Sequence, residues 1–241
     1  VGLPRNGRVE LRQVGGSWMV WQYDENLGQW HRFLPVLLAD ARGTGFMLED
    51  GSLVFEQESG FAQARINITV DDGYWSENTE KMLDWAVRNR WPLSFYLNTD
   101  YVRRGQAEIL GRILKEGHEL GYHTGNHRWL GWSSEEWLDR DLVELEELIR
   151  GETGVGEFRV RSVRPPYGMW DMTWIRWAGR RGLPTILWSY YNEDKDDPRE
   201  DIGQSLEQNK PAVVLLHTRP ECVEWLEAQE EFLQEWRGKG I

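Results

Sequence analysis

The chain has 241 residues, of which 40% are hydrophobic and 28% are charged, and its mean hydropathy is -0.64. These values fit a globular protein of one large or two small domains and exclude a small disulfide scaffold or a disordered chain. No apolar run approaches the length of a bilayer span, so we expect no membrane insertion. The formal net charge of -12 repels phosphate backbones, so we expect no nucleic-acid partner.

Cys222 is the single cysteine, which removes any disulfide framework and any cysteine-rich zinc site. The chain begins at Val1, with no basic segment leading into an apolar stretch, and we expect that a leader has been removed. Most of the 15 Trp are expected in the core.

Residues 1–61 predict an antiparallel β extension, because short strands alternate with turn signals. Its expected strands cover 9–14, 18–23 and 29–33, with a hairpin at 49–52. From residue 62 to 241 strands alternate with helices, which is typical of a main domain built on a parallel sheet. We expect strands at 64–70, 93–97, 118–122, 159–163, 185–190 and 212–216, with helices beginning near Ser76, Gln106, Ser134, Met172, Pro198 and Glu221.

Polar residues follow several of these strands, at the edge where α/β barrels place their sites. Asp71 and Asp72 are adjacent carboxylates, which repel each other unless a cation or a shared proton lies beside them. An Asp-Asp-Gly sequence is also common in solvated turns, so this pair alone does not distinguish a metal site from such a turn. His123 and His127 stand four residues apart and can bind one ion from the same side of a helical turn.

Two histidines and one aspartate leave positions open for water and substrate, which is the pattern of a catalytic metal site with zinc as the default ion. The second carboxylate is then free to take a proton from water at the metal. After the next strand, Arg164 and two prolines precede Tyr167, whose backbone N–H is available because prolines lack that donor. His217 ends the last strand, where it can protonate a leaving group or be a buried structural histidine. Together these residues predict metal-assisted hydrolysis of an acyl group.

The chain resembles polysaccharide deacetylases of carbohydrate esterase family 4 from about residue 66 to its end. Five motifs appear in the family's order: Thr69-Val70-Asp71-Asp72-Gly73, His123-Thr124-Gly125-Asn126-His127, Arg164-Pro165-Pro166-Tyr167-Gly168, Leu187-Trp188-Ser189 through Asp194, and Leu215-Leu216-His217-Thr218. The fold that this resemblance implies is a distorted (β/α) barrel.

The resemblance also implies a role for each matching residue. Asp71 would be the general base and His217 the general acid, with Arg164 orienting the base and Asp194 supporting the acid. The metal ligands would be Asp72, His123 and His127, for zinc or else cobalt or nickel. The backbone N–H of Tyr167 would stabilise the oxyanion, and Leu215 and Trp188 would line the pocket for the acetyl methyl group.

The implied substrate is an acetylated oligo- or polysaccharide with N-acetylglucosamine units, such as chitin oligomers or peptidoglycan, which places the protein outside the cell or in its envelope. Hydrolysis of O-acetyl esters on xylan-like glycans remains open, as does a glycan-binding module on a decayed enzyme fold. A non-haem iron oxygenase also uses two histidines and a carboxylate, but it does not require Asp71 and His217.

The fourth motif departs from the family pattern, because Tyr191 replaces an acidic residue and Lys195 follows Asp194 where tryptophan is usual. Asp196 or Asp197 could therefore take the place of Asp194. Val70 and Tyr74 are further departures near the cleft. Trp75, Trp129, Trp132 and Trp170 follow strand-end motifs and are candidate sugar-stacking residues or core residues.

Overall fold

The computed structural model describes residues 9–14, 17–24, 29–32, 38–40, 43–47, 53–55, 66–73, 77–104, 107–128, 133–192, 199–207 and 212–239. Side chains are described from residue 66 onward, apart from those of Met172, Asp201 and Ser205.

The main domain is built on a five-stranded parallel sheet in the order β11-β12-β7-β8-β9. The strands are β7 (Ile66–Asp72), β8 (Leu93–Leu97), β9 (Glu119–Tyr122), β11 (Tyr190–Tyr191) and β12 (Ala212–His217). Every residue of β12 before His217 is buried, as expected for a parallel strand that is covered on both faces.

The mostly parallel α/β sheet with covering helices agrees with the predicted fold class, and two isolated bridges extend this sheet beyond β9. Val163 bridges in parallel both to Tyr122, at the end of β9, and to Thr185, in β10 (Thr185–Ile186). The same segment continues into β11, which pairs with β12. Segment 185–191 therefore contacts one neighbour at its beginning and the other at its end.

Two predicted strands are wrong in extent. Residues 159–163 form only the bridge at Val163. Buried and exposed positions alternate from Phe158 to Arg161, but Val160 and Val163 lie three residues apart, which breaks the period of two that a strand requires. The strand expected at 185–190 is split into β10 and β11. The carbonyls of Ile186 and Leu187 accept hydrogen bonds from the Arg164 side chain, so the ladder is interrupted there.

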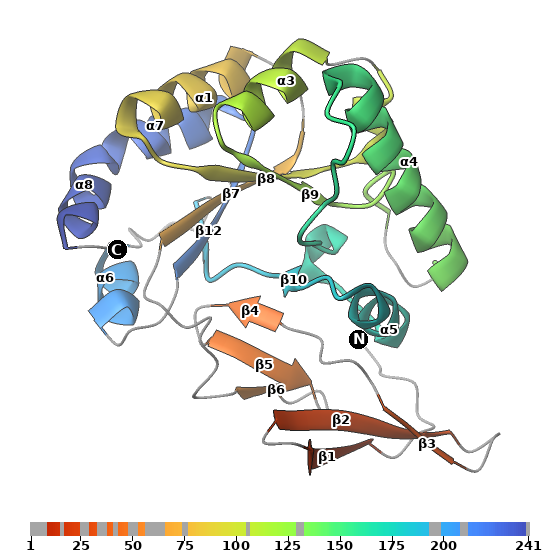
Figure 1. Cartoon of the computed structure of the whole chain (residues 1–241). Coiled ribbons are helices and arrows are strands. Elements are labelled where there is room, and N and C mark those ends of the chain that lie inside the picture. Colours follow the sequence, from red (N-terminus) through yellow and green to blue (C-terminus); the bar gives the residue numbers. More distant parts are fainter. Residues whose placement is uncertain are drawn as a thin grey trace.

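Helices cover the outside of the sheet. They are α1 (Glu77–Asn89), α2 (Thr99–Val102), α3 (Ala107–Lys115), α4 (Glu135–Thr153), α5 (Met172–Arg181), α6 (Arg199–Glu207), α7 (Pro220–Ala228) and α8 (Glu230–Gly238). Figure 1 shows α1, α3, α4, α7 and α8 on one side of β12, β7, β8 and β9. Each predicted helix start lies within one residue of an observed one. The helix expected to begin near Glu221 ends at Ala228, and α8 follows it after Gln229.

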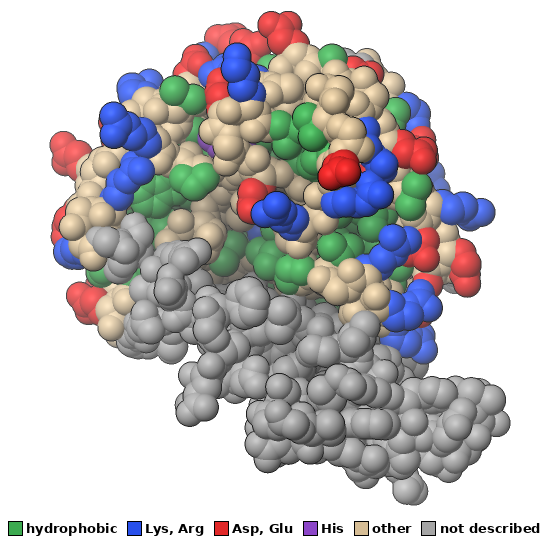
Figure 2. Space-filling view, viewed as in Figure 1, with side chains coloured by type: hydrophobic (Ala, Val, Ile, Leu, Met, Phe, Trp, Pro, Cys, Tyr) green, Lys and Arg blue, Asp and Glu red, His purple; other side chains and the backbone are tan. Residues whose placement is uncertain are grey.

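Apolar residues fill the space between the sheet and its helices. Trp85, Trp174 and Trp177 are among the largest fully buried side chains, so these three have the core role expected for most tryptophans. Cys222 is buried. On the face shown in Figure 2, acidic and basic side chains are interspersed over the described surface.

The amino-terminal extension forms short strands as predicted. An antiparallel sheet contains β1 (Val9–Val14), β2 (Ser17–Asp24) and β3 (Gln29–Arg32). A second sheet contains β4 (Leu38–Asp40), β5 (Gly43–Met47) and β6 (Leu53–Phe55), with β4 lying parallel to β10 of the main domain. The predicted hairpin at 49–52 and the domain boundary at 61/62 lie outside the described residues. Among the helices described, none combines the length and the apolar character that a bilayer span requires.

Candidate metal centre and active site

Three residues predicted as metal ligands lie together at the carboxyl ends of β7 and β9. Asp72, His123 and His127 each offer one ligand atom, and these atoms lie within 4.8 Å of one another. Oδ1 of Asp72 is 3.4 Å from Nε2 of His127 and 3.7 Å from Nε2 of His123. The fold therefore brings the whole set to one point.

The chemistry of these atoms fits a divalent cation. Oδ1 of Asp72 is shielded from solvent and accepts no hydrogen bond from the described residues, which is costly for a carboxylate without a cation. Burial lowers the pKa of His123 and outweighs the opposing effect of the Asp71 and Asp72 carboxylates. His123 is therefore neutral near pH 7, which is the form of imidazole that binds a metal. Two imidazole nitrogens and one carboxylate suit zinc and neighbouring transition metals.

The orientation of His123 is set by a second hydrogen bond. Its Nδ1 lies 2.8 Å from the carbonyl oxygen of Arg164, and because a carbonyl only accepts, Nδ1 carries the proton. Nε2 is then left with its lone pair toward Asp72. Such a bond behind a ligating histidine is typical of metal sites, where it holds both the tautomer and the ring.

Asp71 is held beside this centre by Arg164. Asp71 is 3% exposed, and its Oδ1 accepts a 2.6 Å hydrogen bond from Nη1 of Arg164. Its other oxygen, Oδ2, lies 3.5 Å from Nε2 of His123 and so faces the ligand set. One oxygen of Asp71 is thus fixed in an ion pair while the second faces the site.

Arg164 itself is completely buried and makes bonds in several directions. Nη1 also donates to Oγ1 of Thr69, and Nε donates to the carbonyl of Ile186. The guanidinium lies 4.2 Å from the centre of the Tyr96 ring, as in a cation–π contact. These bonds leave the guanidinium little freedom, so the position of Asp71 is also restricted.

His217 lies near Oδ2 of Asp72, whereas His123 and His127 lie near Oδ1. The register of β12 on β7 places His217 beside Asp71, and its Nε2 lies 3.8 Å from Oδ2 of Asp72. The ring meets Tyr191 edge to face. Nδ1 is buried and has no hydrogen-bond partner in the described part of the chain. Asp194, Asp196 and Asp197, the predicted partners, lie outside that part, so this assignment stays a prediction.

In the turn after Arg164, the backbone N–H of Tyr167 has no acceptor within the described part of the chain. The two hydrogen bonds of the turn are donated by Gly168 to Pro165 and by Met169 to Pro166, so the N–H of Tyr167 is not used in the turn. Tyr167 has φ of 59°, and its exposed ring meets His127 edge to face at 4.4 Å. A side chain at Gly168 would come within 2.6 Å of the Trp188 ring, so the turn requires glycine there.

Backbone strain is concentrated at this site. Asp72, Thr124, His127 and Tyr167 all have positive φ although none is glycine, at 77°, 66°, 53° and 59°. Each such residue costs on the order of 1–3 kcal/mol and persists only where its surroundings hold it. The ligand positions are therefore set by the whole fold and not by local preference.

The structure describes the two residues predicted to line the methyl pocket, but only one of the four candidate sugar-stacking tryptophans. Leu215 is buried in β12, and Trp188 is half-buried with its ring 5.8 Å from the Arg164 guanidinium. Trp170 packs against the core. Trp75, Trp129 and Trp132 lie outside the described residues.

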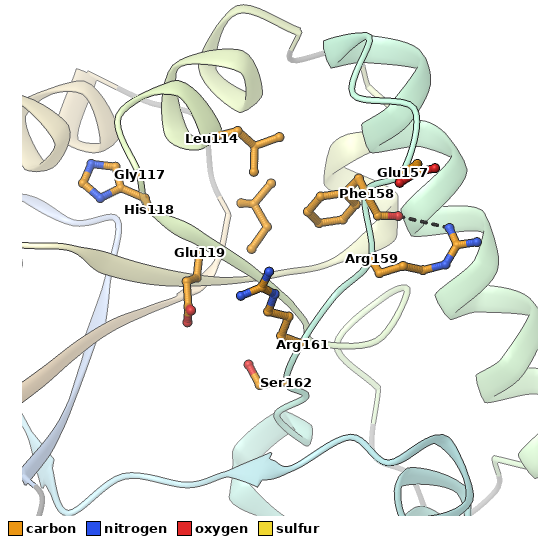
Figure 3. A pocket seen from close by; sticks show the side chains of 10 residues that line it. Leu114, Gly117, His118, Glu119, Glu157, Phe158, Arg159, Arg161 and Ser162 are labelled. Atoms are coloured by element: carbon orange, nitrogen blue, oxygen red, sulfur yellow. Dashed lines mark hydrogen bonds between the residues drawn. The ribbon is translucent and has the colours of Figure 1, made fainter. Parts of the chain in front are cut away.

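A separate hollow of about 420 Å³ lies at the other end of β9 (Figure 3). His118 and Glu119 line it from the beginning of the strand, and Arg159 and Arg161 line it from the segment before Val163. Its lining carries charges of both signs and includes none of the predicted site residues. The Nδ1 atom of His118 accepts a hydrogen bond from the backbone N–H of Leu93.

Several residues that support the site were missed from the sequence. Thr69 and Tyr96 contact Arg164, and Asn98 contacts the loop that carries the histidines. Asn98 carries the same signal as the residues that were found, since it is the first polar residue after the apolar end of β8. Tyr96 carried no such signal, because an aromatic residue within a strand is ordinary core material.

Gly125 gives a direct test of how tightly the loop between the histidines is packed. A Cβ atom at Gly125 would lie 2.5 Å from Oδ1 of the buried Asp141, whereas one at Gly151 would meet nothing within 4 Å. Gly125→Ala is therefore expected to lower the free energy of unfolding by about 1–3 kcal/mol and to weaken zinc binding. Gly151→Ala, in the interior of α4, is the control and is expected to stabilise the protein by about 0.5–1 kcal/mol. Urea denaturation and zinc titration check both, and zinc binding by Gly125→Ala at wild-type affinity would contradict the packing argument.

Known proteins are similar to this chain in sequence and in fold. The family model for polysaccharide deacetylase matches residues 59–186. A peptidoglycan-N-acetylglucosamine deacetylase of Bacillus cereus is 32% identical over 157 residues, which cover 63% of this chain and 71% of the relative. A chitooligosaccharide deacetylase of Sinorhizobium fredii is 28% identical over 162 residues, 66% of this chain and 74% of the relative. The crystal structure of a peptidoglycan N-acetylglucosamine deacetylase in complex with an N-oxidanyl-benzamide superposes with a TM-score of 0.59 at 25% identity, over 72% of this chain and 83% of that one.

Proposed function

Since the chain belongs to the polysaccharide deacetylase family, carbohydrate esterase family 4, we propose that it is a metal-dependent hydrolase acting on N-acetylglucosamine units of chitin oligomers or peptidoglycan. The reaction is hydrolysis of the acetamide, which releases acetate and leaves a free amine. One observation carries the proposal: Asp71, held by Arg164, faces a set of three metal-binding groups, and Nε2 of His217 lies 3.8 Å from Oδ2 of Asp72 in that set.

The metal would be held by Asp72, His123 and His127, with zinc as the default ion and cobalt or nickel as alternatives. When bound, the ion supplies Lewis acidity toward water and toward the acetyl carbonyl oxygen.

Asp71 is the proposed general base. Its Oδ2 faces the ligand set, while its Oδ1 is occupied by Arg164, so only one oxygen is placed to take a proton from the attacking water. Arg164 fixes this division, because its guanidinium is locked by Thr69 and by the carbonyl of Ile186. The carbonyl of Arg164 also orients His123, so one residue positions both the base and a ligand.

His217 is the proposed general acid. As the amide bond breaks, the leaving nitrogen needs a proton, and Nε2 of His217 lies near Asp72 on the side away from the two ligand histidines. We propose that Asp194, or else Asp196 or Asp197, holds Nδ1 and supports the protonated form. The backbone N–H of Tyr167 would stabilise the oxyanion, and Leu215 with Trp188 would enclose the acetyl methyl group.

The proposed substrates are extracellular or envelope glycans, so we propose that the protein works there. Acetate release from an N-acetylglucosamine pentamer, measured beside release from acetylated xylan, tests the substrate. We expect release from the pentamer. Release from xylan alone would make the protein an O-acetyl esterase, and binding of the pentamer with no release from either substrate would make it a glycan-binding module.

A further inference from the structure

Three consecutive carbonyls of the histidine-bearing loop accept hydrogen bonds from one short segment. Nδ2 of Asn98 donates to the carbonyl of His123 at 2.8 Å and to that of Thr124 at 3.2 Å. The backbone N–H of Thr99 also donates to Thr124, and that of Asp100 donates to Gly125 at 2.8 Å. The loop is therefore fixed from the end of the neighbouring strand.

Asn98 contacts both segments that carry the proposed ligands. It directly follows β8, which lies between β7 and β9 in the sheet. Its backbone N–H donates to the carbonyl of Asp72 at 3.4 Å, and its side chain donates to His123 on the other side. No other described residue donates hydrogen bonds to the carbonyls of both Asp72 and His123.

The side chain of Asn98 does not make the capping hydrogen bond that is usual for asparagine at the start of a helix. Asn98 is the N-cap of α2, and asparagine at that position usually accepts a hydrogen bond from the first turn of the helix. Here it makes no such bond and is fully buried, and its amide donors go to the loop instead. Carbonyl oxygens only accept, so the NH₂ group must face them.

These bonds act on a strained residue. The carbonyl of His123 belongs to the peptide before Thr124, and the carbonyl of Thr124 belongs to the peptide after it. Asn98 therefore fixes both peptide planes of a non-glycine residue whose φ is 66°. A residue in this region keeps its conformation only where its neighbours determine it. Without the two bonds, Thr124 would relax and carry the adjacent His123 with it.

We propose that Asn98 is a positioning residue that holds Asp72 and His123 at the separation that metal binding requires. It acts through these two segments and contacts neither the ion nor the substrate. This role rests on the proposed metal-dependent function, and it extends that function to a residue outside the ligand set.

The test compares two buried asparagines in the metal-free protein. Asn98→Leu removes both donors and keeps the number and branching of the side-chain heavy atoms. Asn89→Leu is the matched control, because Asn89 is also buried and its Nδ2 donates to a backbone carbonyl, that of Trp85, at the end of α1. Zinc affinity is measured by competition with a chromophoric chelator, and the thermal stability of each metal-free variant is recorded. We expect Asn98→Leu to bind zinc about 10–100-fold more weakly, whereas Asn89→Leu binds it like the wild type.

Equal zinc affinities for Asn98→Leu and the wild type, or an equal loss in both leucine variants, would overturn the positioning role. If Asn98→Leu does not fold, Asn98→Ala and Asn89→Ala are compared by the same criterion. Failure of the wild type to bind zinc would overturn the proposed function and this role together. If the wild type binds zinc and Asn98→Leu binds it with the same affinity, this role alone is overturned.

Discussion

Asp71→Asn is expected to lower turnover of an N-acetylglucosamine oligomer by a factor of about 10²–10⁴, while zinc remains bound. The substitution keeps the shape of the side chain and an oxygen for Arg164, but an amide cannot accept the proton of the attacking water. Asp71 is not one of the three ligands, so metal content should not change. Steady-state acetate release and zinc titration measure the two effects separately.

Asp84→Asn is the matched control for this experiment, because Asp84 is an exposed aspartate whose carboxylate pairs with Arg112 on the outside of the domain. It should keep full turnover. Wild-type turnover in Asp71→Asn would refute the assignment of the base, and loss of zinc from that variant would make Asp71 a ligand.

Arg164→Met is expected to lower the free energy of unfolding by about 3–5 kcal/mol and to abolish most activity. The stability loss arises because Asp71 would remain buried without its ion pair and because the bonds to Thr69 and Ile186 are lost. Arg164→Lys keeps the charge but cannot reproduce the planar fork of donors, so we expect it to remain impaired. Urea denaturation and acetate release check both variants.

Arg161→Met provides the comparison for Arg164, since Arg161 lies three residues earlier and is exposed. A change at such a surface position is usually within about 0.5 kcal/mol. Equal stability of Arg161→Met and Arg164→Met would show that the buried ion pair does not hold the site together.

Much of the site could be predicted because it depends on where strands end. An apolar run followed by a polar residue is visible in the sequence at Asp71, His123 and His217, and parallel strands bring these ends to one edge of the sheet. Residues that act through the backbone leave less trace. The carbonyl of Arg164 on His123 depends on tertiary proximity that no periodicity reveals. Asn98 has the strand-end position, but that position does not show which carbonyls its amide contacts.

The fold was predicted well where burial alternates or is continuous, and less well where a side chain replaces strand pairing. β8 and the helix starts follow from local pattern. The split between β10 and β11 does not, because it results from Arg164 donating to Ile186 and Leu187 from a distant part of the chain. Arg164 thus contacts both Asp71 and the segment between β10 and β11.

The central claim is tested most directly by acetate release from an N-acetylglucosamine pentamer, measured with the protein as isolated, after chelation, and after zinc is restored. We predict release that disappears on chelation and returns with zinc, because Asp72, His123 and His127 form a site that fits the ion. No release in any of the three states, with zinc confirmed bound, would contradict the account.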